Sequence, residues 1–292
     1  MTSNAEPEAG GEAGPAGPFA GDDAAAHSRG SSFYAAMRIL PRPQREAMFE
    51  VYSFCRAVDD IADDGGPVPG RRAALNTWRR NIDTLYAGSP PGALPPGLIA
   101  AVRTFDLQRA DFQAVIDGME MDVLADIRAP DEATLDLYCD HVASAVGRLS
   151  VRVFGMEERS GLELAHHLGR ALQLTNILRD LDEDASIGRL YLPAQALRAV
   201  GICTTEPVSV LAHPALGGAC TTVVERAREH FVQAGTIMTR NPRRTVRAPR
   251  IMAEAYLAIL ERLVDRGWSH PRRPIHFPRA RLLWIIMRHA FV

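Results

Sequence analysis

The chain has 292 residues, of which 47% are hydrophobic, and its formal net charge is −2. A chain of this length buries roughly 75% of its unfolded surface on folding, which suffices for one large domain or two small ones. All 33 basic residues are arginines, so the absence of lysine excludes pyridoxal Schiff-base enzymes, P-loop nucleotide hydrolases and serine–lysine hydrolases.

Residues 1–30 are dominated by glycine, alanine, proline and acidic residues, with almost no large apolar side chains. Because such a segment cannot bury enough apolar surface to offset its ordering entropy, we predict a disordered tail. The tail lacks the basic and apolar regions of a secretory signal, and the four cysteines lack the spacing of a zinc or redox pair. We therefore expect a cytoplasmic protein.

From Ser31 onward, apolar residues recur at intervals of three and four, and strand-like alternation is essentially missing. This pattern predicts a single all-α domain over residues 31–292. Asp131 has the chemistry of an N-cap, and Gly155 that of a C-cap, for one of its helices. Segments rich in proline and glycine separate the expected helices, which span 43–63, 70–87, 108–125, 131–154, 160–184, 217–239, 249–267 and 278–290.

Four aspartates crowd the last turn of the first expected helix: Asp59, Asp60, Asp63 and Asp64. The Gly-Gly-Pro sequence at 65–67 ends this helix. Carboxylates at a helix C-terminus oppose the macrodipole at about 0.3–1 kcal/mol each, and the spacing of four between Asp59 and Asp63 adds a repulsion of about 0.2–0.5 kcal/mol. A single cluster of this kind is more often a solvated helix end than a site.

A second acidic cluster repeats the pattern. Asp180 and Asp184 lie four residues apart at the end of the helix expected over 160–184, and Gln173 and Asn176 extend a polar stripe upstream along an otherwise apolar helix. Two matched clusters with an amide stripe favour one shared polar site over two solvated helix ends.

Acidic side chains in this number suit a hard cation, because Mg²⁺ prefers oxygen ligands and substrate phosphates complete its shell. We therefore predict bound Mg²⁺ and a diphosphate ligand. Three arginines beside the clusters suit bidentate contacts with phosphate oxygens: Arg56, Arg179 and Arg189. Taken singly, each could instead be the ion-pair partner of a neighbouring aspartate.

The C-terminal part of the chain is basic, with twelve arginines and three acids from Arg240 onward. Its apolar run, Leu282–Met287, is far shorter than the roughly 18 residues of a transmembrane helix. A basic region suits either anionic lipid or a solvated charged surface, and the solvated surface is favoured. We expect at most a weak peripheral contact with the inner membrane face, and no nucleic-acid partner.

Four segments in order resemble the trans-isoprenoid squalene/phytoene synthase family: SSFYAAMRILP (31–41), YSFCRAVDDIADD (52–64), LDLYCDHVASAVGRLSVRVFG (135–155) and LGRALQLTNILRDLDEDASIGRLYLP (168–193). The resemblance extends from about Ser31 to Leu263. Within the family, LRDLDEDASIGRLYLP and GSSFYAAMRILP are most similar to the bacterial branch that makes presqualene diphosphate for hopanoid biosynthesis. The resemblance implies an isoprenoid synthase helical bundle, with two Asp-rich helices facing each other across a central active-site cavity.

By position, the resemblance also assigns roles to single residues. The implied metal ligands are Asp59, Asp60, Asp63, Asn176, Asp180 and Asp184. The implied substrate-binding residues are Arg56, Arg179, Arg189, Gln173, Asn176, Phe33, Tyr191 and Tyr256. The implied catalytic residues are the four spaced aspartates Asp59, Asp63, Asp180 and Asp184 together with Tyr138, whose phenol could stabilise a cation or relay a proton. Without the resemblance, Tyr138 would be taken for a core tyrosine hydrogen-bonded to backbone.

Two small residues on the helix of Tyr138, Ala143 and Gly147, lie four positions apart. They could leave room for prenyl chains in the implied cavity. They could equally allow another helix to pack closely, and both interpretations stay open at this stage.

The implied reaction is the head-to-head condensation of two farnesyl diphosphates to presqualene diphosphate, with release of diphosphate, as a supply for downstream squalene-forming enzymes. Phytoene synthase, dehydrosqualene synthase and a full NADPH-dependent squalene synthase are alternatives. From a different class, the alternative is a non-catalytic helical assembly or lipid-binding protein, against which the intact acidic clusters argue. The chain has no glycine-rich dinucleotide fingerprint, so NADPH is not expected as a cofactor.

Overall fold

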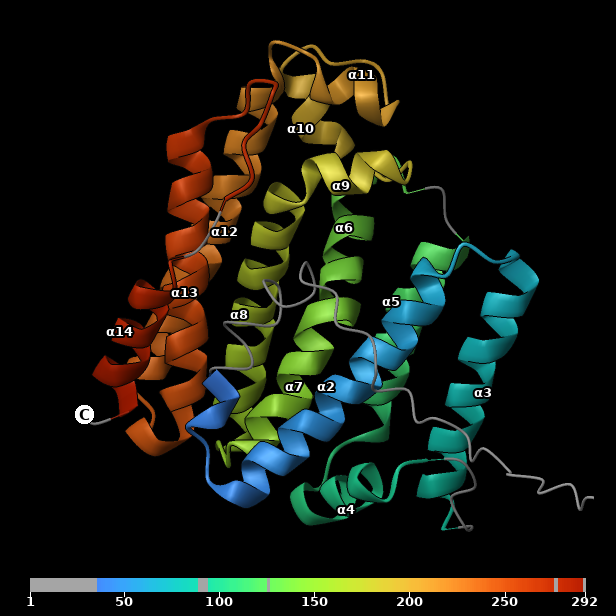
Figure 1. The fold of residues 1–292 in the computed structure, drawn as a ribbon, viewed down its shortest axis with the longest axis vertical. Helices are drawn as coiled ribbons and strands as arrows, with labels where there is room; N and C mark the ends of the chain where they lie inside the picture. Colours follow the sequence, from blue (N-terminus) through green and yellow to red (C-terminus); the bar gives the residue numbers. More distant parts are fainter. Residues whose placement is uncertain (1–35, 89–93, 125–126, 276–277, 291–292) are drawn as a thin grey trace, which may run out of the picture.

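A computed structural model describes residues 36–88, 94–124, 127–275 and 278–290 (Figure 1). Within these ranges every named element is a helix, and the only strand-like feature is an isolated bridge between Arg128 and Leu190. The all-α prediction is therefore confirmed. The predicted tail and Phe33 lie outside the described residues, and the central cavity stays a prediction.

The described part of the chain forms an ordered series of helices that includes one π-helical turn, η1. These are α2 (Arg42–Asp63), α3 (Val68–Tyr86), α4 (Pro96–Phe105), α5 (Arg109–Leu124), α6 (Glu132–Cys139), η1 (Asp140–Ser144), α7 (Ala145–Val153), α8 (Glu158–Arg179), α9 (Leu181–Ser186), α10 (Ala194–Ala199), α11 (Pro207–Leu211), α12 (Leu216–Thr239), α13 (Arg243–Arg266) and α14 (Arg279–Ala290).

Helix α8 runs through the middle of the bundle, with α12 and α13 on one side and α6 and α7 on the other (Figure 1). The buried apolar side chains form two large clusters. One contains Ile177 and Leu178 of α8, and the other contains Val58 and Ala62 of α2. Each acidic helix end is therefore anchored in a different half of the core.

Two glycines allow helices to approach α8 closely. A Cβ at Gly147 of α7 would lie 3.1 Å from the Cα of Ala165, and a Cβ at Gly169 of α8 would lie 2.7 Å from the Cα of Ser144. Backbone atoms cannot move aside as a flexible side chain can. At Gly147 the structure therefore supports close helix packing, the second of the two interpretations above.

Local sequence signals set several helix ends as predicted. The Asp131 carboxylate accepts a hydrogen bond from the Thr134 backbone N–H at 2.7 Å, which confirms the N-cap. Gly155, with φ of 71°, follows the end of α7 as expected. Helix α2 ends at Asp63, where the Ala62 carbonyl accepts a hydrogen bond from the Arg71 guanidinium of α3.

Other boundaries differ from the predictions. The helix expected over 160–184 is two helices, because α8 ends at Arg179 and a turn at Asp180 begins α9. The prediction of 249–267 starts too late, since α13 begins at Arg243 and contains Pro249; burial of Val246 and Ile251 stabilises this extra turn. The periodicity also missed α4, α10 and α11, which have only five to ten residues. Among the described residues, no helix is long and apolar enough to cross a membrane.

Candidate active site

The first acidic cluster lies in the last turn of α2. The Arg56 guanidinium, one turn earlier, donates to the Asp59 carboxylate at 2.9 Å and to the Asp60 carboxylate at 2.7 Å. Asp63 points to a more distant part of the chain, and Asp64 follows the helix end. Arg56 thus forms ion pairs with two of the four carboxylates. This is the alternative interpretation given above, in which each arginine pairs with a neighbouring aspartate.

The second cluster lies at the junction of α8 and α9. Arg179 donates to both carboxylate oxygens of Asp180, at 2.8 and 2.7 Å. The backbone N–H of Asp184 donates to the Asp180 carbonyl at 2.8 Å, which fixes the turn between the helices. The Asn176 amide nitrogen donates to Gln173 at 3.4 Å.

The Asn176 side-chain oxygen is buried and has no hydrogen-bond partner among the described residues. A buried carbonyl oxygen that accepts no hydrogen bond destabilises the fold, unless a ligand binds to that oxygen. A cation with a preference for oxygen is such a ligand, and the surrounding carboxylates supply the same donor type. The residues present therefore fit a hard divalent cation.

Arg189 connects the two clusters. Its guanidinium donates to Asp63 of the first cluster at 3.0 Å, and its backbone N–H donates to the Asp184 carbonyl of the second at 2.8 Å. The bridge between Arg128 and Leu190 fixes the segment that carries Arg189 against the chain that follows α5. Residues far apart in sequence thus form one site.

Asp122 is a site residue that sequence reasoning missed. It lies in the last turn of α5 and accepts hydrogen bonds from the Tyr191 hydroxyl at 2.7 Å and the Tyr138 hydroxyl at 3.0 Å. The two phenol rings are stacked with centroids 4.9 Å apart. The signal that could have found Asp122 is the one used for the clusters, an acid at the C-terminal end of a helix.

Burial and mutual repulsion perturb the acids of the site. Burial, followed by the charge of Asp63, raises the pKa of Asp59 to about 6. Burial, followed by the charge of Asp180, raises the pKa of Asp184 to about 8. Burial also raises the pKa of Asp122, against the opposing effects of Arg189 and the two tyrosines. The charge of Asp122 also contributes to the raised pKa values of Asp59 and Asp184. Asp122 therefore lies close enough to interact with both acidic clusters.

The remaining predicted residues lie around this centre. Tyr138 and Tyr191 are buried, and burial raises the pKa of each phenol, so both stay protonated near neutral pH. Tyr256 of α13 is buried and hydrogen-bonded to Arg179, which joins it to the second cluster. The predicted residues from Arg56 to Tyr256 form one neighbourhood, apart from Phe33, which is not described.

Fold and site together define a class: an all-α protein in which two acid-rich helix ends, paired with arginines, meet near a buried tyrosine pair. Residues 26–281 match the family model described as squalene/phytoene synthase, and the chain belongs to that family.

Several known proteins resemble the chain over most of its length. The presqualene diphosphate synthase of Rhodopseudomonas palustris is 62% identical over 263 residues, which are 90% of this chain and 94% of the relative. The enzyme of the same name from Sinorhizobium fredii is 56% identical over 276 residues, 92% and 99% of the two chains.

Two solved structures of squalene- and dehydrosqualene-forming enzymes superpose on the chain. A dehydrosqualene synthase bound to a ligand superposes with a TM-score of 0.76 at 25% identity, covering 89% of this chain and 90% of that one. A squalene synthase from Alicyclobacillus acidocaldarius superposes with a TM-score of 0.73 at 26% identity, covering 83% and 91%.

Proposed function

We propose that the protein is a prenyltransferase that condenses two farnesyl diphosphates head to head into presqualene diphosphate and releases diphosphate. The observation that supports this most is the convergence of both acidic clusters on Asp122 and its two tyrosines, with Arg189 connecting them. The 62% identity to a presqualene diphosphate synthase selects this reaction within the family.

The residues that would hold Mg²⁺ are oxygen donors of the two clusters: Asp59, Asp60, Asp63, Asn176, Asp180 and Asp184. When bound, Mg²⁺ supplies Lewis-acid charge that stabilises a diphosphate leaving group. The raised pKa values of Asp59 and Asp184 reflect burial and then the repulsion of neighbouring carboxylates, and a divalent cation would offset both effects.

The arginines and Gln173 would bind and orient the diphosphate. Arg56, Arg179 and Arg189 each hold an aspartate of the clusters at 2.7–3.0 Å. Once a cation neutralises those aspartates, the guanidiniums can turn their bidentate donors to phosphate oxygens. Tyr256, through its hydrogen bond with Arg179, orients one of them.

Tyr138 and Tyr191 would act at the reacting carbons. Loss of diphosphate from one substrate leaves an allylic cation, which the double bond of the second substrate attacks. Neutral phenol oxygens, with their protons held by Asp122, present lone pairs that stabilise the cation. Closure of the cyclopropane ring releases one proton, which the Tyr138 hydroxyl and the freed diphosphate can pass on. Phe33 is proposed to line the substrate site.

The test is product identification. Purified protein is incubated with Mg²⁺ and either farnesyl or geranylgeranyl diphosphate, with and without NADPH, and extracts are analysed by mass spectrometry. Presqualene diphosphate from farnesyl diphosphate, unchanged by NADPH, supports the proposal. Squalene formed only with NADPH would make it a full squalene synthase, and dehydrosqualene or phytoene would favour the corresponding alternatives. No product from either substrate would favour the non-catalytic alternative.

A variant pair tests the first cluster. Asp59→Asn should reduce the rate far more than the stability, because it removes a partly exposed carboxylate that is proposed to bind metal. Asp64→Asn is the matched control, since Asp64 follows the helix end as its C-cap and is not one of the residues proposed to hold Mg²⁺. Equal activity of both variants would exclude the metal-binding role of Asp59.

We also propose a weak peripheral contact with an anionic membrane face, for transfer of the apolar product to downstream squalene-forming enzymes. Helix α14 leaves Leu283, Trp284 and Met287 61%, 58% and 52% exposed. Beside it lies a cavity of about 240 Å³ lined by Arg243, Arg247, Arg250, Arg288 and His289. Exposed apolar residues next to cations suit an anionic lipid surface.

Sedimentation with vesicles tests this contact. The protein should bind vesicles that contain phosphatidylglycerol better than phosphatidylcholine vesicles, and Trp284→Ser should weaken the binding. Equal binding to both vesicle types, or to neither, would contradict the proposal.

A further inference from the structure

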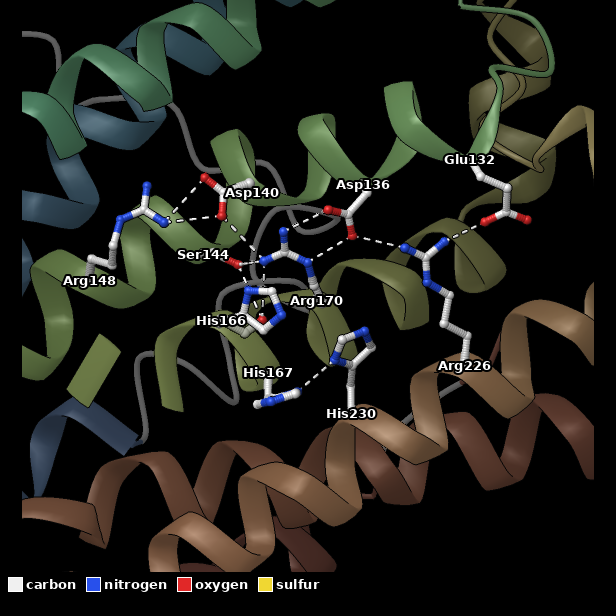
Figure 2. Close-up of polar contacts among 10 residues, drawn as sticks. All are labelled: Glu132, Asp136, Asp140, Ser144, Arg148, His166, His167, Arg170, Arg226 and His230. Atoms are coloured by element: carbon white, nitrogen blue, oxygen red, sulfur yellow. Dashed lines mark hydrogen bonds and ion pairs between the residues drawn. The ribbon is translucent and has the colours of Figure 1, made fainter. Parts of the chain in front are cut away.

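Three histidines that the proposed reaction does not use meet on the face of α8 that packs against α12. His166 and His167 belong to α8, and His230 belongs to α12. Figure 2 shows the three rings turned toward one another, next to the ion-pair network of Arg170. His167 precedes Gln173 by six residues, about 9 Å along the helix, so this cluster is separate from the acidic site.

The nitrogen atoms of this histidine cluster are close together. The Nδ1 atoms of His167 and His230 are 3.0 Å apart, and one coordinating nitrogen from each of the three rings can be chosen so that all lie within 4.8 Å of one another. Ring centroids are 4.8 Å apart for His166 and His167, and 5.2 Å apart for His167 and His230. His167 and His230 therefore share a hydrogen bond between their Nδ1 atoms, and His166 lies within reach of the same point.

The charge state of the histidine cluster suits metal binding. Burial, followed by the charges of nearby cationic groups, lowers the pKa of His230 to about 4 and that of His166 and His167 below the usual value. Neutral imidazoles with free lone pairs are the form that coordinates metals.

The guanidiniums next to the histidine cluster are paired with carboxylates. Arg226 pairs with Glu132 at 2.7 Å and with Asp136 at 2.9 Å. Arg170 pairs with Asp136 at 2.9 Å and with Asp140 at 3.2 Å. Figure 2 shows these pairs as one chain of contacts beside the rings, so each guanidinium next to the histidine cluster is already matched by carboxylates.

We infer that His166, His167 and His230 form a binding site for a divalent transition metal of the zinc class. Tetrahedral coordination with metal–nitrogen bonds of about 2.0–2.1 Å requires nitrogens about 3.3 Å apart. The His167–His230 pair already has nearly this spacing, and His166 is exposed, so rotation of its side chain can supply the third ligand. Solvent would take the fourth position.

The ligand type separates this site from the acidic one. Imidazole nitrogens select zinc, copper or nickel, whereas carboxylate and amide oxygens select magnesium. A metal at the histidine cluster would cross-link α8 to α12, and α8 also bears Gln173 and Asn176. The expected effect is stabilisation of the helix pair that supports the second acidic cluster.

Metal binding with magnesium in excess tests this inference. The full chain, without a polyhistidine tag and stripped with a chelator, is titrated with Zn²⁺ against a metallochromic indicator in millimolar Mg²⁺, and with Co²⁺ for its visible spectrum. We expect one tight equivalent of Zn²⁺ and a Co²⁺ spectrum typical of nitrogen ligands. His230→Gln and His166→Gln should each weaken the affinity at least tenfold, and Zn²⁺ should raise the melting temperature of the wild type but not of these two variants.

Two control variants separate the alternatives. His213→Gln alters a histidine that only accepts a local backbone hydrogen bond, and Asp180→Asn alters the acidic site; both should keep the tight equivalent. Because His166 is exposed, its replacement gives a folded protein even if that of His230 does not. The inference would be overturned if the wild type bound no Zn²⁺ tightly. It would also be overturned if His166→Gln kept the tightly bound Zn²⁺, or if Asp180→Asn lost it.

Discussion

Arg189 and Asp63, 126 positions apart in the sequence, form a hydrogen bond of 3.0 Å that joins the two acidic clusters. The backbone N–H of Arg189 also donates to the Asp184 carbonyl at 2.8 Å. The Arg189 guanidinium therefore neutralises part of the charge of the first cluster, while the Arg189 backbone is fixed to the second. The phosphate ligand that we propose between the clusters would lie close to this guanidinium.

Replacement of Arg189 by methionine should reduce kcat/KM for farnesyl diphosphate by about 10- to 100-fold, the range expected for a lost charge-assisted hydrogen bond. The reason is that both the link to Asp63 and the proposed phosphate contact are lost. Steady-state kinetics at saturating Mg²⁺ measure the effect. Arg198→Met on α10 is the control, since the Arg198 guanidinium donates to the nearby Ala194 carbonyl of its own helix turn. Equal kinetics of the two variants would exclude a substrate-binding role for Arg189.

Asp122→Asn should lower kcat at least tenfold without unfolding the protein. Tyr138 and Tyr191 donate to different carboxylate oxygens of Asp122, and in the amide one of these two positions becomes an NH2 donor, so one phenol loses its acceptor. Single-turnover rates with farnesyl diphosphate measure the loss.

The control for Asp122 is Asp117→Asn on the same helix, where the carboxylate pairs with Arg79 away from the site. A double-mutant cycle with Tyr138→Phe should show strong coupling to Asp122. Additive effects would mean that the hydrogen bond between them does not contribute to the reaction.

The sequence predicted the parts of this molecule that local chemistry determines. Helical periodicity located the long helices, and the cost of carboxylates at helix ends singled out both clusters before any contact was known. The break at Asp180 and the π-helical turn at 140–144 could not be predicted, because they depend on contacts with distant elements. Asp122 was within reach, since it has the same position at a helix end and Asp126 follows it at the same spacing of four, but no amide stripe accompanies this pair as it does the second cluster.

Gly169→Ala should destabilise the protein by about 1–3 kcal/mol, the usual cost of overpacking, despite the better helix propensity of alanine. The added Cβ would lie 2.7 Å from the backbone of Ser144, where α8 meets η1. Urea denaturation measures the change. Gly235→Ala on α12 is the control, because nothing lies within 4 Å of its added Cβ, and it should stabilise by about 0.5–1 kcal/mol. A destabilised control, or a neutral Gly169→Ala, would contradict this account of the packing.

Arg170→Met tests the ion-pair network of Figure 2. Arg170 is only 5% exposed and donates to both carboxylate oxygens of Asp136 at 2.9 Å and to Ser144 at 2.9 Å. Its loss should cost about 2 kcal/mol at pH 7, the range for hydrogen bonds to charged groups. Arg159→Met on the same helix is the control; its ion pair with Glu163 is exposed and should contribute less than about 1 kcal/mol.

The cost of Arg170→Met should also depend on pH. Hydrogen bonds from Arg170 are the main cause that lowers the pKa of Asp136 below its ordinary value. A carboxyl group whose folded pKa is depressed stabilises the fold fully above its unfolded pKa of about 3.9, and the contribution is lost as the pH falls through the folded value. Urea denaturation with chelator present should therefore show the variant and the wild type differing most at pH 7 and converging below about pH 4. A difference that stays constant as the pH falls well below 3.9, down to the acid unfolding of the protein, would mean that the Asp136 charge contributes nothing, and that Arg170 stabilises α8 by packing alone.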